Sequence, residues 1–363
     1  MLKKDGSCVV IFNAETMRDA IWLAVLLYLS TGLSYSTKNL SDLVQLNTDS
    51  VTVSGLSSGA YMAVQYSIAH SSSINGTAVF AGGPYYCAES SLILAESRCM
   101  SHFEGEEVAE ELAKYTFDAS VLGTIDDVEN LKSGRMKFYL YSGKVDSVVD
   151  SSVMRGLESY LQLMEVSSAS IRGVFDVESE HCLPTDGTDP LLEPCTTLSE
   201  PYIGKCNYDG AGDALKSILG GEDLKPRADM IAENLVEFSQ VEYNIHGSLS
   251  SINDVGYIYI PTSCQSSNSN HSNCRLHVSF HGCKQNIQVI GDTYARHSGF
   301  NEWAEANDIV VMYPYVKPSL DALPVNPKGC WDWWGYTNDE YGLKSGWQIE
   351  FVHALVNAVV VDA

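Results

Sequence analysis

Residues 55–59, with the sequence GLSSG, place a serine in a pattern that is used for nucleophilic catalysis. The alternating residues 51–54 before it are typical of a strand, and residues 61–70 after it have the composition of a helix. A G-x-S-x-G segment between a strand and a helix is typical of a nucleophile elbow. We therefore expect Ser57 to be the nucleophile and the N–H group of Ser58 to stabilise an oxyanion. A plain glycine–serine turn is the alternative.

A serine nucleophile requires an imidazole base and a carboxylate that orients the imidazole. In α/β hydrolases these partners follow the serine in the order acid and then histidine, each after a strand. Asp146 follows the expected strand 136–142, and His181 follows the expected strand 170–177. We therefore predict that Asp146 is the acid and that His181 is the base.

Other carboxylates and histidines fit these roles less well. Asp150 is an alternative acid, but it is expected to start the next helix, and Asp176 lies inside an expected strand. Several histidines lack a loop position after a suitable strand or lie in expected helices: His70, His246, His271, His277, His297 and His353. A single histidine is more often structural than catalytic, so the position of His181 is what favours catalysis.

An oxyanion hole needs a second N–H donor, commonly from a His-Gly segment after a neighbouring strand. His281, Gly282 and Cys283 follow the expected strand 275–280, and we predict that the N–H group of Cys283 is this donor. Such a segment ordinarily precedes the nucleophile, whereas here it follows Ser57 far along the chain. We therefore expect a circularly permuted fold, which nearby chain termini make tolerable. An ordinary turn after a strand is the alternative.

Strands and helices are expected to alternate along the chain. The predicted strands are 51–54, 78–81, 136–142, 170–177, 255–260, 275–280 and 309–313. The predicted helices are 61–70, 104–117, 152–166, 211–219, 227–238, 294–307 and 347–360. This alternation predicts an α/β fold with a doubly wound, mostly parallel sheet and helices on both faces. Residues 182–206 are expected to be a long surface loop, and residues 37–363 a single catalytic α/β-hydrolase domain.

The composition limits the partners and the compartment of the protein. The chain has 363 residues and a net charge of −24, which disfavours nucleic acid and anionic membranes as partners. The apolar run 20–29 is too short to cross a membrane and is typical of a signal peptide. We expect residues 1–36 to be a signal peptide, with Met17 as an alternative start, and the mature protein to be secreted. A buried helix at 20–29 is the alternative.

The cysteines agree with secretion. The chain has ten cysteines, and nine remain once Cys8 is assigned to the leader. An odd number in a secreted protein predicts disulfides and one free thiol. No spacing of cysteine or histidine is typical of zinc, and we expect neither a metal nor a cofactor. N-glycosylation sequons occur at Asn39, Asn75 and Asn270.

Five segments, taken together, are specific enough to indicate a family. They are residues 54–63, 83–87, 181–186, 281–283 and 326–336. These segments resemble the catalytic domains of secreted poly(3-hydroxybutyrate) depolymerases, and the resemblance extends from about Thr52 to the C-terminus. It implies a circularly permuted α/β-hydrolase fold. The catalytic set that it implies is Ser57, Asp146 and His181, with oxyanion donors from Ser58 and Cys283.

The resemblance also implies four disulfides. Their pairs are Cys87–Cys99, Cys195–Cys206, Cys264–Cys274 and Cys283–Cys330. Cys182 then remains as a free thiol directly after His181, where we expect another residue type in the family. Many relatives carry a separate polymer-binding domain, and this sequence contains no segment of that kind.

Aromatic residues near these motifs could line a groove for an ester chain, since flat apolar surfaces bind with little loss of rotamer entropy. The candidates are Trp331, Trp333, Trp334, Tyr85 and Tyr86. A place in the hydrophobic core is as good an interpretation for each tryptophan.

The residues predict a two-step acyl transfer, in which Ser57 attacks an ester and water then releases the acid. The predicted protein is a secreted, monomeric serine esterase that hydrolyses a polyester or oligoester. An esterase for feruloyl or acetyl esters of polysaccharides is one alternative. A catalytically inactive hydrolase fold that binds a ligand is another.

Overall fold

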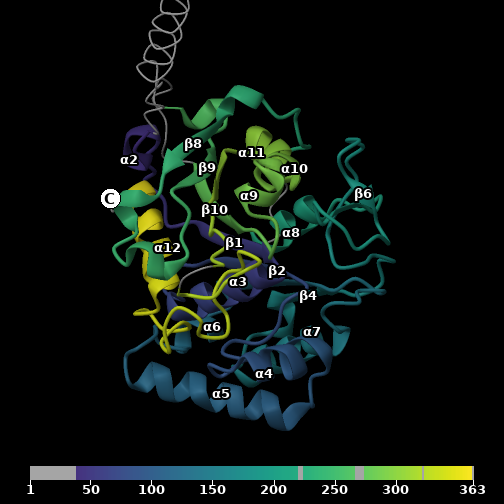
Figure 1. Ribbon diagram of the computed structural model, residues 1–363, viewed down its shortest axis with the longest axis vertical. Helices are drawn as coiled ribbons and strands as arrows, with labels where there is room; N and C mark the ends of the chain where they lie inside the picture. Colours follow the sequence, from purple (N-terminus) through teal and green to yellow (C-terminus); the bar gives the residue numbers. More distant parts are fainter. Residues whose placement is uncertain (1–37, 220–223, 266–273, 321–322, 362–363) are drawn as a thin grey trace, which may run out of the picture. The chain divides into compact units, whose positions relative to one another are not determined.

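An eight-stranded sheet lies at the centre of the fold (Figure 1). From one edge to the other its strands are β4 (Ile171–Val174), β3 (Lys137–Tyr141), β2 (Gly76–Phe80), β1 (Val51–Leu56), β10 (Arg275–Phe280), β11 (Ile309–Tyr313), β9 (Val255–Tyr259) and β8 (Leu235–Ser239). The strands from β4 to β11 are parallel, and β9 is antiparallel to β11 and β8. The computed structural model describes residues 38–219, 224–265, 274–320 and 323–361. The predicted signal peptide and the sequon at Asn270 lie outside these ranges.

The strand order places β1 in the middle of the sheet. Strands β2, β3 and β4, which follow β1 in sequence, continue the sheet on one side. Strands β8 to β11, which come last in the sequence, fill the other side, and β10 pairs directly with β1. The C-terminal strands thus occupy the positions that usually precede a nucleophile strand. This is the permuted α/β-hydrolase order.

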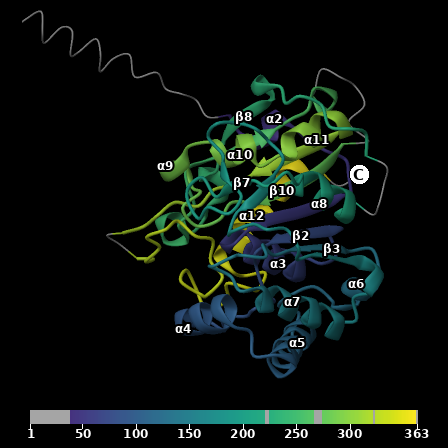
Figure 2. The same ribbon diagram turned by 90° about the vertical axis from the view of Figure 1, so that its right-hand side faces the viewer.

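Helices cover both faces of this sheet (Figure 2). Helices α3 (Ser58–Ala69) and α12 (Trp347–Val359) pack together on one face, and α8 (Gly210–Ile218) and α11 (Phe300–Asn307) pack together on the other. Every residue of α3 is buried, because the helix lies between the sheet and α12. β1, β2 and β11 are also fully buried, as expected for parallel strands covered on both faces.

The remaining helices are short or peripheral. They are α2 (Leu40–Leu43), α4 (Leu92–Glu96), α5 (Glu106–Val121), α6 (Glu129–Lys132), α7 (Ser151–Leu163), α9 (Ile287–Ile290) and α10 (Thr293–His297), with one π-helical turn, η1 (Ser97–Ser101). The 3₁₀ turns are η2 (Ser168–Ser170), η3 (Ala232–Asn234), η4 (Val241–Tyr243), η5 (Gly247–Ser250) and η6 (Thr262–Cys264). Among the residues with a defined position, none of these helices has the length and hydropathy needed to cross a bilayer.

Three predicted elements differ from the structure. The helix predicted at 227–238 is wrong, because that segment ends in the edge strand β8, whose backbone pairs with β9. The helix predicted at 294–307 is two helices, since Gly299 at φ +86° separates α10 from α11. The segment predicted as a loop at 182–206 contains a small sheet, in which β7 (Ile203–Lys205) lies between β5 (Leu183–Thr185) and β6 (Glu193–Pro194). In each case a long-range contact or one backbone angle overrides the local pattern.

Candidate active site

The turn that carries Ser57 joins β1 to α3. Ser57 adopts φ +56° and ψ −121°, a conformation that L-residues rarely adopt. A Cβ atom on Gly59 would lie 2.2 Å from the carbonyl oxygen of Phe280, at the end of β10. The first turn of α3 can therefore press against β10 only because residue 59 is glycine. This close approach places the hydroxyl of Ser57 beside the loop that follows β10.

Asp146 and His181 meet at the carboxyl ends of β3 and β4. Asp146 Oδ2 lies 2.9 Å from His181 Nδ1. Asp146 Oδ1 accepts hydrogen bonds from the N–H groups of Val148 at 2.8 Å and Val149 at 2.9 Å. The Asp146 side chain is 1% exposed, and the His181 side chain is 8% exposed. This carboxylate is therefore fixed by its own loop and orients the imidazole through Nδ1.

The alternative acids have other positions. Asp150 caps helix α7, where its Oδ1 accepts from the N–H group of Ser152 at 2.8 Å. Asp176 is exposed. The contact with His181 thus separates Asp146 from both alternatives.

Backbone hydrogen bonds join the Asp146 loop to the His181 loop. The N–H group of Lys144 donates to the carbonyl of Val177 at 2.9 Å. The carboxylate of Glu180 accepts from the N–H groups of Ser147 at 3.1 Å and His181 at 2.6 Å. Glu180 could not be found from the sequence, because a single Glu before a histidine has no distinctive pattern. Its two backbone contacts connect the loop that carries Asp146 to the backbone of His181.

The predicted oxyanion loop lies next to the nucleophile. A Cβ atom on Gly282 would lie 3.5 Å from the Cβ of Ser57. The N–H group of Gly282 donates to Oε1 of Gln285 at 2.6 Å, and Nε2 of Gln285 donates to the carbonyl of Pro201 at 2.8 Å. Gln285 is fully buried and fixes this loop, although no sequence signal pointed to it. No described residue accepts a hydrogen bond from the N–H of Cys283, so this donor is available to a ligand.

His281 has a structural position behind this loop. Its Nδ1 donates to the carbonyl of Gly282 at 2.7 Å, and its Nε2 accepts from the N–H group of Val316 at 3.3 Å. Burial lowers the pKa of His281 to about 4, so the ring is neutral near pH 7. Its ring stacks on Tyr315, whose centroid lies 4.7 Å away. The histidine of the His-Gly segment therefore supports the loop and does not face the pocket.

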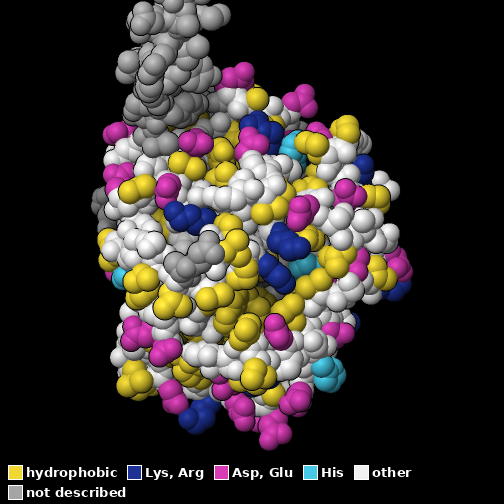
Figure 3. Space-filling model, in the orientation of Figure 1, with side chains coloured by type: hydrophobic (Ala, Val, Ile, Leu, Met, Phe, Trp, Pro, Cys, Tyr) yellow, Lys and Arg dark blue, Asp and Glu magenta, His cyan; other side chains and the backbone are white. Residues whose placement is uncertain are grey.

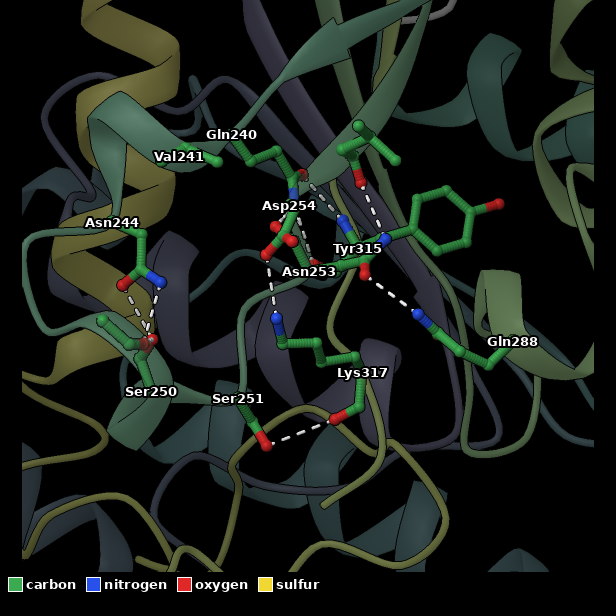
Figure 4. Close-up of polar contacts among 12 residues, drawn as sticks. Gln240, Val241, Asn244, Ser250, Ser251, Asn253, Asp254, Gln288, Tyr315 and Lys317 are labelled. Atoms are coloured by element: carbon green, nitrogen blue, oxygen red, sulfur yellow. Dashed lines mark hydrogen bonds and ion pairs between the residues drawn. The ribbon is translucent and has the colours of Figure 1, made fainter. Parts of the chain in front are cut away.

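A polar network anchors the strand end that carries Tyr315 (Figure 4). Gln240 Nε2 donates to the carbonyls of Asn253 at 2.8 Å and Tyr315 at 2.9 Å, and Gln240 Oε1 accepts from the N–H of Tyr315. Lys317 forms an ion pair with Asp254 at 2.8 Å. The support beneath His281 thus comes from residues distant in sequence.

Ser57, His181 and Cys283 line one pocket of about 250 Å³. Its other lining residues are Leu56, Tyr61, Met100, Val148, Val149, Leu198, Tyr202, Gly282, Lys284, Gln285, Lys328 and Trp333. The hydroxyl of Ser57 makes no hydrogen bond to His181 in this structure. Catalytic hydrogen bonds are often long when no substrate is bound, and the shared pocket keeps the two groups within reach of one substrate.

The chain is similar to known proteins over most of its length. No family model matches the chain. It is 37% identical to poly(3-hydroxybutyrate) depolymerase from Delftia acidovorans over 90% of this chain, and it spans 63% of that relative's length. It is 32% identical to polyhydroxybutyrate depolymerase from Talaromyces funiculosus over 87% of this chain and 91% of that protein.

The chain belongs to the polyhydroxybutyrate depolymerase family.

Solved structures of this family share the fold. The PHB depolymerase of Penicillium funiculosum superimposes with a TM-score of 0.77 at 33% identity, over 87% of this chain and 97% of that protein. A serine-to-alanine variant of a PHB depolymerase, complexed with an R3HB trimer, gives the same values.

The part of the chain that the structure describes contains four disulfides, with the pairs that the family resemblance implies. They are Cys87–Cys99, Cys195–Cys206, Cys264–Cys274 and Cys283–Cys330. The Cys283–Cys330 disulfide joins the loop after β10 to the tryptophan-rich loop, residues 326–337.

Cys182 is a buried free thiol beside His181. Burial raises the pKa of Cys182 to about 12, so this thiol is protonated and unreactive near neutral pH. A Cβ atom on Gly204 would lie 2.5 Å from its sulfur, so the thiol packs tightly against β7.

The tryptophans predicted to line a groove lie partly in the pocket and partly in the core. Trp333 lines the pocket with Ser57 and stacks on Tyr61 at 4.2 Å. Trp333 and Trp334 also line an adjoining groove of about 520 Å³. Trp331 is instead fully buried against Phe280.

The two predicted tyrosines lie away from the pocket. Tyr85 is fully buried, and its hydroxyl donates to the carbonyl of Gly342 at 2.8 Å. Tyr86 stacks on Tyr115 of α5 at 3.8 Å. Neither tyrosine is among the residues that line the pocket or the adjoining groove. Their sequence position beside a glycine-rich strand end did not distinguish a core contact from a surface one.

Asp332 organises the tryptophan-rich loop, defined here as residues 326–337. Its carboxylate accepts hydrogen bonds from the N–H groups of Trp334, Gly335, Tyr336 and Thr337 and from the hydroxyl of Thr337. Burial raises the pKa of Asp332, while these hydrogen bonds act in the opposite direction. In the sequence, Asp332 is distinguished only as one residue of the motif 326–336. The structure identifies it as the group that holds the loop together.

Proposed function

We propose that this protein is a serine esterase that hydrolyses polyesters or oligoesters of the poly(3-hydroxybutyrate) type. Ser57 attacks the ester carbonyl while His181 Nε2 takes the hydroxyl proton. The N–H groups of Ser58 and Cys283 stabilise the tetrahedral oxyanion. The alcohol leaves with the proton from His181, and water then releases the acid from Ser57 by the reverse sequence.

The contact of 2.9 Å between Asp146 Oδ2 and His181 Nδ1 carries this proposal. A carboxylate that accepts from Nδ1–H selects the tautomer whose Nε2 is unprotonated, which is the form that a general base needs. His181 lines the pocket that also contains Ser57 and Cys283. One pocket thus contains a nucleophile, an oriented base and a free N–H donor.

The substrate class rests on the relatives and on the character of the pocket. Both curated relatives are named as depolymerases of polyhydroxybutyrate, and one similar structure contains an R3HB trimer. The pocket wall includes the apolar side chains of Met100, Leu198 and Trp333, which suit the methyl-substituted backbone of such a polyester.

A hydrolysis panel tests the activity and the substrate together. Polyhydroxybutyrate film, soluble hydroxybutyrate oligomers and p-nitrophenyl esters of graded length are offered to wild type, Ser57→Ala and Ser168→Ala. We expect hydroxybutyrate release by wild type and a decrease in kcat of about 10⁵- to 10⁶-fold in Ser57→Ala. Ser168 is exposed beside the amino end of β4, and its substitution serves as the matched control. Retained esterase activity in Ser57→Ala would disprove the nucleophile.

The same panel separates the alternatives. Release of ferulate or acetate from polysaccharide esters, without release of hydroxybutyrate, would favour the other class of esterase. Failure of an organophosphonate to label Ser57 would favour a binding protein without activity.

We also propose that the protein is secreted. Four disulfides among the residues with defined positions support an oxidising compartment. N-terminal sequencing of protein collected from the culture medium is the test. A mature chain that begins before Ala20 would contradict cleavage of the predicted signal peptide.

A further inference from the structure

Two lysines, Lys284 and Lys328, line the pocket that contains Ser57. No Asp or Glu is among the lining residues, although the chain has 46 acidic and 22 basic side chains. On the face seen in Figure 3, Lys and Arg side chains likewise border an area where hydrophobic side chains gather. The local charge of the pocket is therefore opposite to that of the whole protein.

The backbone holds the two lysines in adjacent positions. The N–H group of Lys284 donates to the carbonyl of Lys328 at 2.7 Å. The Cys283–Cys330 disulfide joins the same two segments, and Asn286 Nδ2 donates to the carbonyl of Lys328 at 3.2 Å. Lys284 is half-buried and Lys328 is exposed. Two ammonium groups are thus attached to fixed backbone at one side of the pocket.

Neither lysine forms an ion pair with a described residue, whereas many other basic side chains do. The paired ones are Arg98, Lys114, Lys132, Lys144, Arg172, Arg227, Arg296, Lys317 and Lys344.

Two acidic residues beside the pocket, Glu180 and Glu96, form no ion pair with either lysine. Glu180 accepts from two backbone N–H groups beside His181. Glu96 lines the adjoining groove together with Lys328, but no oxygen of Glu96 lies within 4.0 Å of the Lys328 ammonium. An anionic ligand is therefore the group that can neutralise these two charges.

We propose that Lys284 and Lys328 bind the terminal carboxylate of a short ester oligomer. This inference rests on the proposed esterase function and adds a preference for carboxylate-terminated substrates. In a polyester of hydroxy acids, the alcohol that leaves the scissile ester belongs to the part of the chain that ends in the free carboxylate. A carboxylate held at residues 284 and 328 would therefore position the leaving group next to Ser57, and cleavage would occur close to the carboxyl end.

The first experiment measures binding without hydrolysis. Hydroxybutyrate trimer, as the free carboxylate and as its methyl ester, is titrated into Ser57→Ala and into Ser57→Ala with Lys284→Gln and Lys328→Gln. We expect the Kd of the carboxylate to rise about 5- to 20-fold, as for two partly exposed ion pairs, and the Kd of the methyl ester to stay unchanged. High salt should weaken carboxylate binding only when both lysines are present.

The second experiment measures KM in the enzyme with Ser57 intact. Lys284→Gln with Lys328→Gln should raise KM for the carboxylate with little change in kcat. Lys284→Arg with Lys328→Arg should have a KM close to that of wild type. Lys114→Gln is the matched control, because Lys114 is exposed on α5 and pairs with Asp118. Equal effects on the carboxylate and the methyl ester, or no effect on either, would overturn the proposal. If the wild-type protein hydrolyses none of the esters, the esterase function is disproved. The binding experiment would still decide the role of the lysines.

Discussion

The nucleophile turn and the tryptophan-rich loop contribute to the same pocket, but different contacts fix them. The turn at Ser57 is held by main chain, between β1 and α3 and against β10. The loop 326–337 has almost no regular structure and is held by the carboxylate of Asp332 and the Cys283–Cys330 disulfide. The candidate nucleophile therefore lies on a turn that backbone contacts define, whereas the wall of the pocket depends on a few buried side chains. Changes near the turn should alter kcat, and changes in the loop should alter KM and stability.

The largest expected effect lies on the catalytic side. Asp146→Asn should lower kcat by about 10,000-fold, because the amide would favour the wrong tautomer of His181. Its unfolding midpoint should change little. Asp150→Asn is the matched control, since asparagine also caps α7. Steady-state kinetics on a p-nitrophenyl ester are the measurement, and the opposite pattern in the two variants would assign the acid to Asp150.

The next largest expected effect concerns the buried carboxylate of Asp332 in the loop 326–337. Asp332→Ala should reduce the free energy of unfolding by about 3 kcal/mol, because it leaves several partly buried donors without an acceptor. Asp332→Asn keeps one oxygen acceptor and should cost less. Urea denaturation gives the stability, and KM for an oligomer reports on the wall of the pocket. A normal KM in a folded Asp332→Ala protein would show that the loop does not depend on this group.

The disulfides give a matched pair of smaller effects. Cys283→Ser with Cys330→Ser opens a bridge with a sequence separation of 47, and it should cost roughly 2 to 4 kcal/mol and raise KM. Cys264→Ser with Cys274→Ser opens a bridge with a separation of 10 away from the pocket, and it should lower stability without changing KM. Similar KM values in both double variants would show that the pocket wall does not depend on the Cys283–Cys330 disulfide.

The smallest effect near neutral pH concerns the sheet beneath the nucleophile turn. Burial lowers the pKa of His277 to about 3, and its ring nitrogens contact the hydroxyls of Thr52 and Ser54 on β1. A histidine with a depressed pKa in the folded state contributes stability that is lost as pH falls from about 6.5 toward 3.

The test compares two pH profiles of stability. His277→Gln should remove about 1.4 kcal/mol per pH unit from the slope of unfolding free energy between pH 6 and 4. Urea midpoints for both proteins measure this difference, which also cancels the effect of the large net negative charge. Parallel profiles would mean that His277 is not neutral in the folded protein.

The sequence by itself determined the chemical residues and most of the strands. Ser57, Asp146, His181 and Cys283 each follow a strand of the parallel part of the sheet, and in a parallel sheet the carboxyl ends of the strands meet at one edge. Local pattern therefore carried enough information to place these residues together. The permuted strand order also followed from the sequence, because the His-Gly segment 281–283 follows the strand that leads into Ser57, whereas such a segment ordinarily precedes that strand.

Only the tertiary structure decided what surrounds these residues. Glu180 and Gln285 contact backbone groups of Ser147 and Pro201, which come near only after the chain has folded, so no local spacing could reveal these contacts. The aromatic residues show the same limit, because Trp333 and Trp331 have similar sequence surroundings but lie in the pocket and in the core. Local sequence sets backbone conformation, whereas burial and hydrogen-bond partners depend on segments distant in the chain. For that reason the proximity of the candidate catalytic residues was predictable, whereas the residues that support them were not.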